Sequence, residues 1–128
     1  MGTPAAPTMA TATERSAVVG KAVARAADLL GMTNASLART IGVSEATTSR
    51  LKAGNYAPEP GTKPYELSLL LIRLFRGLAA VVGGEELSVI SWMETENLAL
   101  HGVPRELVQT VTGLVAAVDY VDAARARI

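Results

Sequence analysis

The sequence predicts an all-α protein, in which an N-terminal helix-turn-helix bundle is followed by a second helical domain. Apolar residues recur at intervals of three and four, which is the spacing of a helix face, and no stretch shows the alternation of a β-strand. The 128 residues include one Trp, one Phe and three Tyr, so the core must be aliphatic, which suits helix packing better than a β-sandwich. The segment from Thr33 to Lys52 has the spacing of a helix-turn-helix.

Residues 1–13 predict a disordered leader, because they contain two prolines and no ionisable side chain. They lack the basic start and the long apolar core of a secretory signal. The first helix is expected from Ser16 to Leu30, and Gly31 should end it. Its inward stripe is expected to be Val19, Ala22, Val23, Ala26 and Leu30.

The helix-turn-helix is supported by the role that each position can take. Thr33 is a good N-cap for the first helix, in which Leu37 and Ile41 form an inward face. Gly42 can adopt the positive φ angle of a tight turn, and Ser44 can cap the second helix. A generic helical hairpin would meet some of these demands, so it stays as an alternative.

The second helix of the motif is expected to enter the DNA major groove. Thr48 and Leu51 should turn inward and leave a polar face outside. Arg50 could read a guanine or hold a phosphate, and Lys52 is expected to touch a phosphate. The candidate DNA-binding residues are Ser44, Glu45, Thr47, Ser49, Arg50 and Lys52. The alternative is a solvated polar helix face that binds nothing.

The domain boundaries are expected at a Pro- and Gly-rich segment. Residues 57–63 should link a helix-turn-helix domain at residues 14–56 to a helical domain at residues 64–128. Basic residues outnumber acidic ones in the first domain, and acidic residues outnumber basic ones after it. This difference suggests that the protein has two functions on two separate surfaces.

The second domain should open with a long helix from Pro64 to Val82, which is apolar on most of its sides. Such a helix is central in a core or lies in an oligomer interface. We expect a homodimer built largely on this helix, with Leu71 and Phe75 as dimerisation residues.

Shorter helices are expected in the rest of the second domain. One should run from Glu85 to Met93, and another should begin at Pro104. Thr110, Thr112 and Gly113 weaken a helix, so we expect a break or kink there. The expected inward residues are Leu87, Ile90, Trp92 or Met93, Leu107, Val108, Val111, Leu114, Val118 and Val121 or Asp122.

Composition excludes several classes of protein. The absence of cysteine excludes a disulfide framework and fits a reducing cytoplasm, and a single histidine excludes a multi-histidine metal cluster. The zero net charge argues against non-specific coating of nucleic acid. We find no Gly-rich cofactor motif and no acid–base constellation, so we expect neither a cofactor nor an enzyme. The apolar run around Leu67–Leu74 is too short to span a membrane.

Three features have two interpretations. Arg73 and Arg76 could bind an acidic partner or form a plain polar stripe. Asp122 could bind a partner or pair with Arg125 on the same helix face. His101 is expected to be a solvated loop residue.

The chain resembles the Xre/MbcA/ParS antitoxins, which are partners of RES-domain toxins. The most specific residues are Trp92, Asn97, the run Leu100-His101-Gly102, and the run from Pro104 to Leu107. The resemblance covers Ser16 to Ile128. One departure is His101, where the family more often has glycine, and this leaves the local loop conformation open.

The resemblance implies an antitoxin of a type II toxin–antitoxin system, in which the N-terminal part represses its own operon. The C-terminal helical domain would bind and block a RES toxin that depletes NAD by attacking its glycosidic bond. Family members are usually dimers, and their C-terminal helix meets the entrance of the toxin's active site. The residues implied in toxin binding are Tyr120, Asp122, Arg125, Arg127 and Ile128. The alternative is a stand-alone regulator whose second domain dimerises or senses a ligand.

Overall fold

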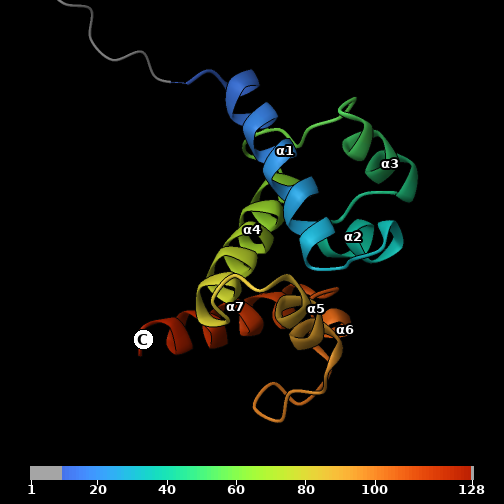
Figure 1. Ribbon diagram of the computed structural model, residues 1–128. Coiled ribbons are helices and arrows are strands. Elements are labelled where there is room, and N and C mark those ends of the chain that lie inside the picture. The colour runs from blue at the N-terminus through green and yellow to red at the C-terminus, as the bar shows by residue number, and fades with distance from the viewer. Residues whose placement is uncertain (1–9, 128) are drawn as a thin grey trace, which may run out of the picture.

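A computed structural model describes residues 10–127 of the chain (Figure 1). Its helices are α1 (Ala12–Leu29), α2 (Asn34–Ile41), α3 (Glu45–Ala53), α4 (Lys63–Val81), α5 (Glu86–Glu94), α6 (Pro104–Leu107) and α7 (Val111–Arg125). Within these residues there is no strand, only an isolated antiparallel bridge between Asn97 and Gly102. The predicted all-α fold is therefore confirmed.

Helix α4 is the centre of the core, because α1 packs along it and α7 crosses it. In Figure 1, α2 and α3 lie to one side of α1 and α4, and α7 lies across the far end of α4. Leu71, Leu74 and Leu78 of α4 are fully buried. Helices α4 and α7 approach each other closely at Gly77, where an added Cβ would lie 2.7 Å from a methyl carbon of Val121.

The assignment of Leu71 to a dimer interface is wrong. Its side chain has 0% exposure within the single chain, so it cannot meet a second copy in this fold. The many apolar sides of α4 are instead covered by α1, α2 and α7. Phe75 is only partly buried against the same core.

Helix α1 begins earlier than the sequence predicted. Thr11 and Glu14 form a capping box, in which Thr11 Oγ1 accepts from Glu14 N at 3.1 Å and Glu14 Oε2 accepts from Thr11 N at 3.2 Å. Ala12 and Thr13 are therefore helical rather than part of a leader. The rest of the predicted leader, residues 1–9, lies outside the described residues.

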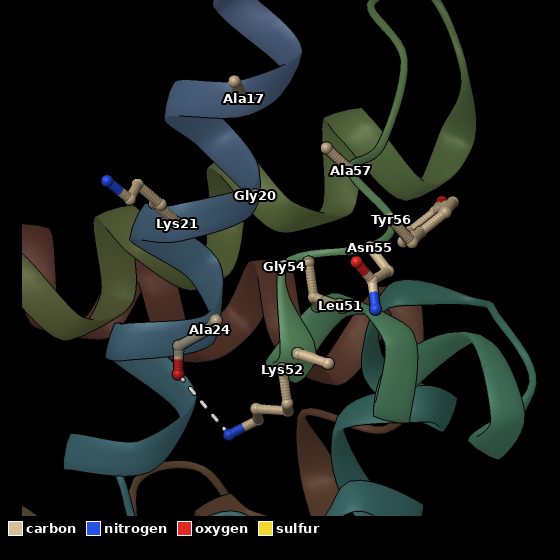
Figure 2. A pocket seen from close by; sticks show the side chains of 11 residues that line it. Ala17, Gly20, Lys21, Ala24, Leu51, Lys52, Gly54, Asn55, Tyr56 and Ala57 are labelled. Carbon is tan, nitrogen blue, oxygen red and sulfur yellow. Dashed lines mark hydrogen bonds between the residues drawn. The ribbon is translucent and has the colours of Figure 1, made fainter.

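The segment predicted as a linker is fastened to α1. Ser16 Oγ donates to the Pro58 carbonyl oxygen at 2.6 Å, and both residues are buried. A Cβ added at Gly20 would lie 2.9 Å from Ala57 Cβ, so glycine permits the close approach. Beside this crossing is an open hollow of about 670 Å³ between α1 and the end of α3, lined partly by Ala17 and Ala24 (Figure 2).

The predicted break in the C-terminal region is confirmed, because α6 ends at Leu107 and α7 begins at Val111. Thr110 caps α7, with its Oγ1 accepting from Gly113 N at 3.0 Å. Two expected inward residues are wrong, since Leu87 is 82% and Val111 is 61% exposed. The buried residues of this region are Val89, Met93, Pro104, Val108, Leu114, Ala117, Val118 and Val121.

Gly113→Ala should destabilise the fold strongly. An added Cβ would lie 1.9 Å from the Leu107 carbonyl oxygen, which is backbone and cannot rotate away. Overpacking of this kind costs about 1–3 kcal/mol or more. Urea denaturation followed by circular dichroism measures the free energy of unfolding, and Thr112→Ala at the exposed neighbouring position is the control. Equal stability of the two variants would contradict the tight approach at Gly113.

Candidate DNA-binding and toxin-binding surfaces

The helix-turn-helix has the geometry that its sequence predicts. Thr33 Oγ1 accepts from Ser36 N at 3.1 Å at the start of α2, and Ser44 Oγ accepts from Thr47 N at 3.0 Å at the start of α3. Gly42 takes φ 76° at the turn between the helices. The inward residues of the motif, Leu37, Ala38, Ile41, Thr48 and Leu51, are all buried.

Thr48 is fully buried in the helix-turn-helix, so its hydroxyl needs a hydrogen-bond partner. Its Oγ1 donates to the Ser44 carbonyl oxygen at 3.1 Å. The hydroxyl of this buried threonine is therefore hydrogen-bonded at the start of α3.

The outer face of α3 carries a connected row of polar side chains. Ser44 Oγ donates to Thr47 Oγ1 at 3.0 Å, and Arg50 Nη2 donates to the same Thr47 oxygen at 2.9 Å. Glu45 and Ser49 are exposed on the same helix. The row aligns the guanidinium of Arg50 along the exposed face before any ligand binds.

Lys52 lies apart from this row. Its ammonium group forms an ion pair with Asp28 of α1 and lies 3.5 Å from the Ala24 carbonyl oxygen (Figure 2). Only 20% of its side chain is exposed. Lys52 therefore fastens the end of α3 to α1, which differs from the free phosphate contact expected from the sequence.

Tyr56 was not among the sequence candidates, although it follows the end of α3. Its ring packs partly against the core, and Figure 2 shows it directed away from Lys52 and α1. Burial raises the pKa of the Tyr56 phenol, Glu59 raises it further, and Arg50 opposes the shift. The phenol is therefore protonated at neutral pH and can donate a hydrogen bond beside the Arg50 end of the row. The only sequence signal for a role of Tyr56 was its position two residues after Gly54, which ends α3.

The candidate toxin-binding residues are distributed around α7. Asp122 forms a two-point ion pair with Arg73 of α4, with Nη2–Oδ2 at 2.7 Å and Nε–Oδ1 at 3.4 Å. It therefore joins α7 to α4 and does not pair with Arg125. Tyr120 stacks on Trp92 of α5, with ring centroids 6.2 Å apart. Arg125 and Arg127 are exposed, and Ile128 lies outside the described residues.

The loop after α5 is ordered by its own hydrogen bonds. Asn97 Oδ1 accepts from Leu100 N at 3.0 Å, and the Asn97 and Gly102 backbones bond in both directions. His101 takes a left-handed conformation with φ 61°, which glycine adopts without strain. The loop thus keeps its turn with histidine at a position that favours glycine.

Two adjoining family models match the chain. Residues 9–76 match the antitoxin Xre-like helix-turn-helix domain, and residues 77–127 match the antitoxin Xre/MbcA/ParS C-terminal toxin-binding domain. The matches meet inside α4, the helix that both halves share in the core. No match to a curated protein was found. No single helix within residues 10–127 is long and apolar enough to cross a membrane. The pair α4 and α5 reaches that length and apolar character only together, and the chain bends by 117° between these two helices.

Proposed function

Since this chain belongs to the Xre/MbcA/ParS family of antitoxins, we propose that it neutralises a RES-domain toxin that degrades NAD, by binding that toxin directly in the cytoplasm. The chain is an antitoxin with a DNA-binding helix-turn-helix and a toxin-binding domain, and both matched families are regulatory rather than enzymatic. The observation that carries the proposal is the pair of adjoining matches, which covers residues 9–127.

The toxin proposal is tested by co-expression with a RES-domain protein, taken from the gene next to the antitoxin gene if that gene encodes one. Cells that make the toxin alone should lose NAD and stop growing, and the antitoxin should restore both. Binding of operator DNA without any rescue would instead favour a stand-alone regulator.

We propose that the polar row on α3 reads the operator upstream of the antitoxin's own gene, which gives autorepression. Base edges would meet Arg50, with Ser44, Glu45, Thr47 and Ser49 around it, and Tyr56 would donate to a backbone phosphate. Support comes from the hydrogen-bonded row, which holds Arg50 ready on an exposed face.

Arg50→Ala should weaken binding of the operator by about 1–3 kcal/mol if its guanidinium reads a base. The matched control is Arg76→Ala, which removes an exposed arginine from α4. Gel shifts on the DNA upstream of the gene, with random DNA beside it, measure the effect. The proposal would be contradicted if the wild-type protein bound that site no more tightly than random DNA.

We propose that the antitoxin is a homodimer, because a helix-turn-helix reader gains specificity by binding two half-sites. Phe75 is the one of the two predicted dimerisation residues that reaches the surface. It lines a hollow of about 250 Å³ with Arg25 and Leu29 of α1 and Ala79 of α4.

We propose that Tyr120, Arg125, Arg127 and Ile128 contact the toxin, and that Asp122 acts by holding α7 on α4. The ion pair with Arg73 supports this positioning role, because both carboxylate oxygens of Asp122 bind the guanidinium on α4.

A further inference from the structure

The first half of the toxin-binding domain carries acidic side chains without any lysine or arginine. Residues 77–104 contain four glutamates, Glu85, Glu86, Glu94 and Glu96, and no lysine or arginine. All four are exposed. The only ion pair from a base to this group in the described chain is Arg105 to Glu94, at the long distance of 3.7 Å. A partner with positive charge would therefore complement this region.

An apolar groove lies on α5, the helix that has Glu85 and Glu86 at its start and Glu94 at its end. The outer face of α5 has a shallow groove of about 450 Å³, lined by Val82, Leu87, Ser88, Ser91, Trp92 and Thr95. Trp92 is partly exposed and stacks on Tyr120, which is 38% exposed. Leu87 is 82% exposed, although the buried face of the same helix already holds Val89 and Met93. Folding therefore gives no reason for a leucine at position 87.

We propose that this α5 patch, defined as Leu87, Trp92, Tyr120 and the groove beside them, is the surface on which the toxin docks. Trp and Tyr are the residues that most often dominate binding energy, especially at the centre of an interface with a polar rim. The exposed acids at both ends of α5 fit a toxin surface that is basic around an apolar projection. This inference rests on the proposed function, in which the RES-domain toxin is the partner.

The chain offers a matched pair of leucines for the test. Leu98 is 83% exposed, like Leu87, but it lies on the loop after α5 and does not line the groove. Neither side chain supports the core, so Leu87→Arg and Leu98→Arg should both fold, which circular dichroism checks. Full-length proteins are titrated with the RES-domain toxin in a calorimeter. Leu87→Arg should bind about tenfold more weakly or worse, and Leu98→Arg should stay within about twofold of wild type.

Trp92 gives a direct second readout, because it is the only tryptophan in the chain. Antitoxin labelled with fluorotryptophan should give one fluorine NMR signal, and saturation with unlabelled toxin should shift it. An unchanged signal at saturation, or equal weakening by both leucine variants, would overturn the docking surface. If wild type binds the toxin and Leu87→Arg binds it equally well, only the docking surface is wrong. If wild type binds no RES-domain protein, the proposed toxin is wrong and the docking proposal falls with it.

Discussion

Leu71→Asp should leave the antitoxin unfolded. Leu71 has no exposure and lies where α4 packs between α1 and α7. An ionised carboxylate buried there without a partner costs several kcal/mol, which is comparable to the whole stability of a small domain. Circular dichroism should show loss of helix at temperatures where wild type is folded. A well-folded Leu71→Asp monomer would contradict the assignment of Leu71 to the core of the single chain.

Phe75→Asp is the control that separates folding from dimerisation. Phe75 is only partly buried, so a carboxylate there can stay hydrated at the mouth of its hollow. The variant should keep its helical spectrum. If the proposed homodimer uses this surface, light scattering should show a folded monomer. A folded dimer would move the dimer interface elsewhere on the chain.

The helix-turn-helix could be predicted from sequence because its determinants are local. Thr33 and Ser44 cap helices whose first turns follow them directly, and Gly42 supplies the one left-handed residue of the turn. The position of the long helix α4 was harder to predict. A helix that is apolar on most sides fits both an interface and a central core, and only the packing of α1 and α7 decides between them.

The α5 helix shows a second reason for error. Its nine residues contain several apolar side chains at helical spacing, so more than one inward face was compatible with the pattern. The tertiary contacts bury Val89 and Met93 and leave Leu87 outside. This is why the exposed leucine of the α5 patch could not be identified from the sequence.

Two candidate site residues have partners far away in the chain. Lys52 pairs with Asp28 from 24 positions earlier, and Asp122 pairs with Arg73 from 49 positions earlier. Spacing rules for a single helix cover only three or four positions, so they suggested Arg125 for Asp122. Long-range pairing of this kind follows from how α1, α3, α4 and α7 pack, which periodicity does not specify.

Deletion of Ala123 to Ile128 should abolish rescue from the toxin while leaving folding and operator binding intact. No residue among 123–127 is fully buried, and the deletion keeps both the contact of Val121 with Gly77 and the ion pair of Asp122 with Arg73. Together with the buried Leu114, Ala117 and Val118, these contacts keep α7 on α4. The helix-turn-helix lies on the other side of the core and should be unaffected (Figure 1).

The deletion and Leu87→Arg should fail in different ways if the α5 patch supplies affinity and the tail blocks the active site. The truncated antitoxin should still bind the toxin in a calorimeter but leave its NAD-degrading activity uninhibited. Leu87→Arg should inhibit fully once its concentration is raised above its weaker dissociation constant, because its tail is intact. Gel shifts with the operator are the control for both, and should match wild type within about twofold, since neither change touches α3. Full protection by the truncated antitoxin would show that the tail has no part in neutralisation, and blocking would then have to come from the α5 patch alone.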